Sequence, residues 1–86
     1  MTNREMFEHI QENAPHLNAI RYALNELEAA ALTASDVYNC TNVSEYNSDA
    51  VECEKIAAAL TALYNNITSR EAANLQASET KHGEVE

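Results

Sequence analysis

The chain has 86 residues, including 15 alanines but only one glycine and one proline, and its net charge is −9 at pH 7. This composition favours helices over tight β-hairpins, and the length supplies core for one small domain. The sequence has no run of roughly 20 apolar residues to span a bilayer, and the charge disfavours nucleic acid and anionic membrane surfaces. Acidic residues stand where a signal peptide needs an apolar run. We therefore expect a cytoplasmic all-α protein with no membrane contact and no direct binding of nucleic acid.

The first predicted helix covers residues 3–13. Thr2 followed by Glu5 matches a capping box, in which the threonine side chain accepts a hydrogen bond from a main-chain amide of the first turn. Helical spacing places the apolar residues on one face and the acidic ones on the other; these are Met6, Phe7, Ile10 and Ala14 against Glu5, Glu8 and Glu12. We expect this short amphipathic helix to dock on the rest of the protein.

Two heptad ladders follow, and they predict two long helices. The first ladder steps by 3 and 4 through Leu17, Ile20, Leu24, Leu27, Ala31, Ala34 and Tyr38; the second runs through Val43, Tyr46, Ala50, Cys53, Ala57, Leu60, Tyr64 and Ile67. Apolar residues at this spacing form a seam that needs a helical partner. We expect a helix over residues 15–39 that packs antiparallel against a helix ending near Leu75. Tyr22, Ala29 and Leu32 lie off the seam and form a second apolar strip, which could receive the first helix or be a binding surface.

The ladders are separated by a stretch rich in Asn, Ser and Thr, which predicts a connection over residues 39–44. With no glycine available, we expect an asparagine to take the left-handed turn position. One continuous helix with a stutter is the alternative. The domain then spans residues 1–75, and residues 76–86 are expected to be a disordered acidic tail. Either the first helix completes a three-helix bundle or two chains form a dimeric bundle. We favour the homodimer, because the hydrophobic core of a single chain is thin.

No catalytic or cofactor motif is present, so we expect a protein that is not an enzyme and holds no cofactor. His9 and His16 follow Glu5 and Glu12 at i,i+4 spacing on faces expected to be solvated, which is too few ligands for a metal site. Cys40 and Cys53 flank the connection, and a bridge between them could stabilise the chain by about 3 kcal/mol. Because cytoplasmic thiols are normally reduced, we expect both to be free.

The interval between Arg21 and Lys55 contains acids but no lysine or arginine. Six of these acids form the candidate partner-binding surface: Glu28, Asp36, Glu45, Asp49, Glu52 and Glu54. A charged run is most often simply a solvated face. The functional hypothesis is that this surface engages a basic groove, such as one that binds nucleic acid.

The sequence is therefore most consistent with a small acidic protein-binding module, an inhibitor or adaptor, that engages a basic protein such as one that handles nucleic acid. In size and charge alone it is similar to small inhibitor proteins of phages and mobile elements. The alternative is a structural or chaperone-like subunit whose apolar seam pairs with another helical protein. An enzyme or a metal-binding protein is the third and weakest interpretation.

Overall fold

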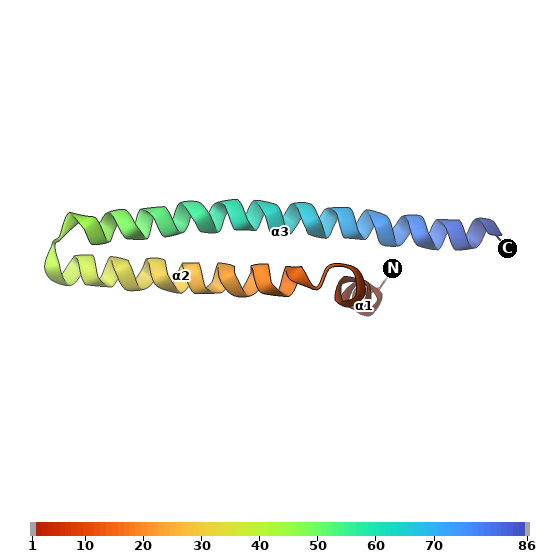
Figure 1. Cartoon of the computed structure of the whole chain (residues 1–86), viewed down its shortest axis with the longest axis horizontal. Coiled ribbons are helices and arrows are strands. Elements are labelled where there is room, and N and C mark those ends of the chain that lie inside the picture. Colours follow the sequence, from red (N-terminus) through yellow and green to blue (C-terminus); the bar gives the residue numbers. More distant parts are fainter. Residues whose placement is uncertain (1, 86) are drawn as a thin grey trace.

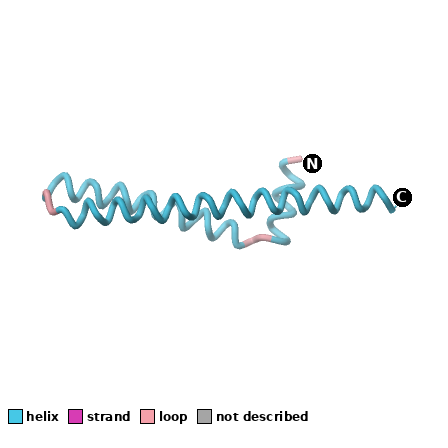
Figure 2. The backbone as a smooth tube through the Cα atoms, turned by 90° about the horizontal axis from the view of Figure 1, so that it is seen from above, coloured by secondary structure: helices cyan, strands magenta, loops and turns pink. Residues whose placement is uncertain are grey.

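A computed structural model describes the backbone of residues 2–85 and the side chains of residues 2–78. Its three helices are α1 (Asn3–Asn13), α2 (His16–Thr41) and α3 (Ser44–Val85). α2 and α3 lie side by side and antiparallel, and α1 lies across α3 at the open end of this hairpin (Figures 1 and 2). The described chain is thus an all-α helical hairpin with a short N-terminal helix, as the sequence predicts.

The turn of the hairpin depends on Asn42, which has φ 59° and ψ 21°. Its main-chain N–H donates to the Tyr38 carbonyl oxygen at 2.7 Å and closes the end of α2. Asparagine tolerates this left-handed conformation better than most residues with a Cβ. The prediction of a left-handed asparagine is confirmed, and the alternative of one continuous helix is wrong. The connection is shorter than expected because α2 continues to Thr41, whose hydroxyl donates to the Val37 carbonyl oxygen.

The predicted seam is the interface between α2 and α3. Every ladder residue of α2 is buried or half-buried, and so is every ladder residue of α3 from Ala50 to Ile67. Near the turn the seam residues are less buried, since Val43 is 40% and Tyr46 is 39% exposed. The best-buried cluster lies at the other end of the hairpin and consists of Ala14, Leu17 and Ile67, with Ile10, Ile20 and Tyr64 packed against it.

The first helix docks, but not along the hairpin. Thr2 Oγ1 accepts from the Glu5 main-chain amide at 3.1 Å, as the capping box predicts. Ile10 packs against the core cluster, whereas Phe7 on the same face of α1 remains 62% exposed. α1 also leaves the second strip bare, with Tyr22 68% and Leu32 69% exposed.

α3 is the longest helix and extends well past the start of α2. Its 42 residues continue to Val85, beyond the end expected near Leu75. Good helix formers such as Gln76 and Ala77 allow the helix to continue there. The side chains of residues 79–86 lie outside the described residues, and the division of the chain at residue 75 stays a prediction. α1 contacts α3 and crosses it where α3 extends past the start of α2 (Figure 2).

Candidate functional site

The six acidic residues expected to form the partner-binding surface are all exposed. They lie between the middle of the hairpin and its turn, on the yellow and green parts of α2 and α3 in Figure 1. We call this region the acidic turn end; it comprises Glu28, Asp36, Glu45, Asp49, Glu52 and Glu54. Because the chain reverses at Asn42, acids from both helices gather at one end of the molecule.

The acidic turn end is not a single patch, because helical periodicity puts its members on different sides of the hairpin. Glu45, Asp49 and Glu52 are spaced i, i+4, i+7 and form one stripe on α3. Glu54 lies on the other side of the α3 seam, since it follows the ladder residue Cys53 by one position and Asp49 precedes Ala50 by one. Asp36 occupies the side of α2 turned away from α3. The structure therefore brings the stripe together and distributes the remaining acids around the rod.

One lysine partly neutralises this region. Lys55 Nζ lies 3.2 Å from Glu52 Oε1, and both side chains are about two-thirds exposed. An exposed pair of this kind contributes only about 0–1 kcal/mol to stability. Because it stands against several unpaired carboxylates, the turn end keeps its negative field.

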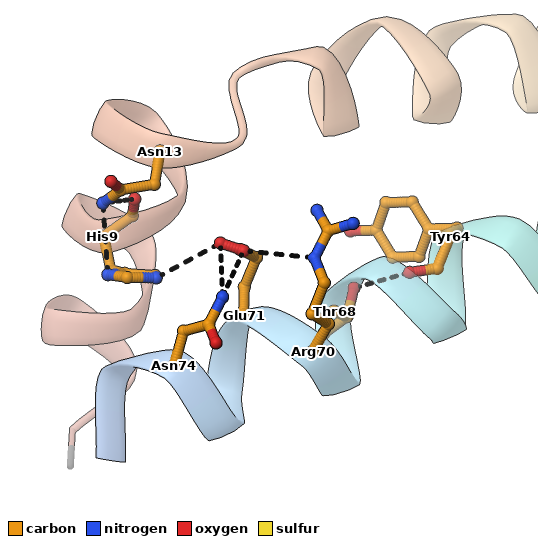
Figure 3. A network of polar contacts seen from close by, with 7 residues as sticks. All are labelled: His9, Asn13, Tyr64, Thr68, Arg70, Glu71 and Asn74. Carbon is orange, nitrogen blue, oxygen red and sulfur yellow. Dashed lines mark hydrogen bonds and ion pairs between the residues drawn. The ribbon is translucent and has the colours of Figure 1, made fainter. Parts of the chain in front are cut away.

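A second polar site lies where α1 crosses α3 (Figure 3). Glu71 is only 5% exposed although it is charged. Its carboxylate accepts from Asn74 Nδ2 at 3.3 Å and lies 3.5 Å from Arg70 Nε. On the other side, His9 Nε2 on α1 lies 3.5 Å from Glu71 Oε1. Residues from both ends of the chain thus meet around one buried carboxylate.

Asn13, one helical turn further along α1, contacts both the main chain and the ring of His9. Asn13 Nδ2 donates to the His9 carbonyl oxygen at 3.0 Å and approaches His9 Nδ1 at 3.2 Å. Nε2 is buried and lacks a hydrogen-bond partner among the described residues, and it lies 3.5 Å from Glu71 Oε1. This distance is longer than that of a typical N–H···O hydrogen bond.

Sequence reasoning missed this cluster, although a signal was present. The ladder step of four after Ile67 falls on Glu71, and the next step of three falls on Asn74. The ladder spacing therefore continues for two more positions after the apolar residues end, and both positions hold polar residues. The expectation that His9 lies on a solvated face is wrong, since its side chain is only 14% exposed. The crossing of α1 over α3 covers it, and helical periodicity within α1 does not encode that crossing.

Neither Cys40 nor Cys53 forms a disulfide, in agreement with the sequence-based prediction. Cys40 is exposed and Cys53 is half-buried on the seam. The turn at Asn42 explains their separation, because it places residues near 44 opposite Cys40. Within the residues that the structure describes, no three potential metal ligands lie together. No helix in that same part of the chain is long and apolar enough to cross a membrane.

Comparison with known proteins found no matching family model, no similar curated protein and no similar solved structure.

Proposed function

We propose that this protein is a small non-enzymatic protein-binding module, an inhibitor or adaptor acting in the cytoplasm, whose acidic turn end engages a basic protein. The observation that carries the proposal is the set of six exposed carboxylates around one end of the rod. No lysine or arginine occurs in the sequence between Arg21 and Lys55 to balance them. A surface that is only solvated needs no such segregation of charge, and mixed signs serve solubility as well.

The shape of the hairpin supports a groove rather than a flat patch as the partner's surface. The molecule is 67 Å long and only 17 by 16 Å in cross-section. A narrow rod with acids on several sides can enter a basic groove and meet positive charge on each wall. Grooves of that kind bind the phosphates of nucleic acids, so a nucleic-acid-handling protein is the partner that fits best.

We also propose that the protein works as a homodimer. Leu17 is the one large side chain in the described residues that is fully buried, and several large apolar side chains remain exposed. A domain with so thin a core commonly gains stability from a second subunit.

The other candidate function is a subunit whose seam pairs with a different helical protein. It has weaker support, because the ladder residues of α2 already pack against α3 within the same chain. A foreign helix would have to displace α3 and lose that packing. The seam is therefore occupied, whereas the acidic turn end is open.

The proposal is tested by capturing partners from a lysate of the source cells and measuring them by quantitative mass spectrometry. Two variants each remove three charges from the turn end: Glu45→Gln, Asp49→Asn, Glu52→Gln on one side, and Glu28→Gln, Asp36→Asn, Glu54→Gln on the others. A control variant makes the same change in net charge on α1 through Glu5→Gln, Glu8→Gln and Glu12→Gln.

We expect wild type and the α1 control to enrich the same basic proteins, and at least one turn-end variant to lose them. The captured partner should also lose binding to DNA or RNA when wild type is added. Equal capture by all four proteins would show that the turn end is only a solvated surface. Loss in the α1 control alone would move the binding surface to the opposite end.

A further inference from the structure

The two sides of the hairpin differ sharply in polarity. On α2, the residues directly before Leu24, Ala31 and Tyr38 of the ladder are apolar. On α3, the residues directly before Ala57 and Tyr64 are apolar as well. We call this set the apolar flank: Ala23, Ala30, Val37, Ile56 and Leu63. The corresponding positions on the other side of the seam are polar or charged: Arg21, Glu28, Ser35, Asn47, Glu54 and Thr61.

The apolar flank is one continuous face. An antiparallel helix pair has an approximate two-fold axis perpendicular to the plane that contains both helices. That rotation exchanges the helices without exchanging the two sides of the plane, so equivalent ladder positions on α2 and α3 lie on the same side. Val37 is 37%, Ile56 is 51% and Leu63 is 45% exposed, so α1 does not cover this face. The alanines at 23 and 30 allow another helix to approach closely.

The charges at the ends of this face identify its occupant. Along α3 the residues at intervals of seven are Asp49, Ile56, Leu63 and Arg70, each about 10.5 Å from the next. This line is negative, apolar, apolar and positive, so it is complementary to itself when one copy is reversed. Asp49 then faces Arg70 of the second copy, and Ile56 faces Leu63 of the second copy. Self-complementarity of this kind is what a two-fold symmetric interface requires.

We propose that the apolar flank is the contact surface of a homodimer in which two hairpins stack face to face with their turns at opposite ends. The inference rests on the proposed homodimer and adds its surface and its orientation. The other two-fold arrangement places α3 of one copy over α2 of the other and brings the two acidic turn ends to the same end of the dimer. Like charges placed together oppose association, so the opposite-end arrangement is favoured.

In this arrangement the α3 helices of the two copies lie antiparallel, with Asp49 of each copy opposite Arg70 of the other. The acids of the turn end that lie on the other sides of the rod stay exposed at the two ends of such a dimer.

The first experiment measures the mass of the full-length protein in solution by sedimentation equilibrium. We expect twice the 9.5 kDa of one chain. Leu63→Glu places a charge in the apolar flank and should weaken dimerisation at least 10-fold. The matched control is Val51→Glu, because Val51 is similarly exposed, at 41%, but lies on the other side of α3. Circular dichroism of both variants confirms that they keep the helical fold.

The second experiment tests the orientation by reversing charges. Asp49→Arg alone and Arg70→Asp alone should each weaken the dimer, and the double variant should restore it, since each reversed residue meets its reversed partner. The rescue also separates this effect from the contact of Arg70 with Glu71 inside one chain. A monomeric wild type would overturn the homodimer itself. A dimer that Leu63→Glu and Val51→Glu affect equally would overturn the surface, and single reversals without rescue would overturn the orientation.

Discussion

His9 and Glu71 come from opposite ends of the chain, yet His9 Nε2 lies 3.5 Å from Glu71 Oε1 beneath the crossing of α1 and α3. Glu71 occupies a position of the heptad ladder that an apolar residue would normally fill. A buried carboxylate is costly unless it is paired and hydrogen-bonded, and here Asn74, Arg70 and His9 surround it. The contact therefore specifies where α1 docks rather than adding much net stability.

A double-mutant cycle measures that coupling. His9→Ala and Glu71→Ala should each destabilise the fold, and the double variant should lose less than the sum of the two. We expect a coupling of about 1 kcal/mol, because the contact is long for a hydrogen bond. Urea unfolding gives the free energies, and hydrogen exchange of the α1 amides shows whether α1 is released. Strict additivity would mean that the two side chains are neighbours without energetic coupling.

Burial along α2 predicts a contrast between two leucines. Leu17 is 1% exposed in the core cluster, whereas Leu32 is 69% exposed on the outer side of α2. Leu17→Ala should cost about 2–5 kcal/mol, because it removes a fully buried side chain and leaves a cavity. Leu32→Ala should change stability by no more than about 0.5 kcal/mol. Equal losses in thermal or urea unfolding would contradict the assignment of the core.

The turn can be tested at Asn42, whose φ of 59° disfavours other residues with a Cβ. Asn42→Ala should destabilise the hairpin by roughly 1 kcal/mol, because the left-handed conformation costs an ordinary residue about that much. Asn42→Gly should be close to neutral, since glycine adopts this conformation freely. The comparison requires only the unfolding free energies of the two variants. If alanine were tolerated as well as glycine, the turn would not depend on a left-handed residue.

The sequence predicted the parts of the fold that follow from local pattern. The 3–4 spacing of Leu17 to Tyr38 identified the buried face of α2, and the lack of glycine near residue 42 pointed to an asparagine in the turn. The crossing of α1 over α3 was not predictable in this way. It depends on contacts between residues far apart in sequence, such as Ile10 with the cluster of Leu17 and Ile67.

The candidate site likewise has features that local sequence pattern predicts and features that it does not. The acids of the turn end were visible as a gap in lysine and arginine, and their exposure agrees with that pattern. Their distribution around the rod depends on which side of each helix faces the seam. Asp49 and Glu54, which lie on opposite sides of the α3 seam, show this. The buried Glu71 was missed because a polar residue in an apolar ladder normally indicates the end of the seam.

The most direct test of the acidic turn end is the association rate of a captured basic partner, measured at about 50 and 300 mM salt. Exposed charges steer encounter and are screened beyond ~10 Å at 0.1 M salt. Wild type and the α1 control should therefore bind quickly at low salt and slow strongly as salt rises. The variant with Glu45→Gln, Asp49→Asn and Glu52→Gln should keep its helical fold, because it relieves like-charge repulsion within α3, yet bind slowly with little salt dependence. If this variant and the variant with Glu28→Gln, Asp36→Asn and Glu54→Gln both kept the rate and the salt dependence of wild type, the proposal that the acidic turn end engages the partner would be contradicted.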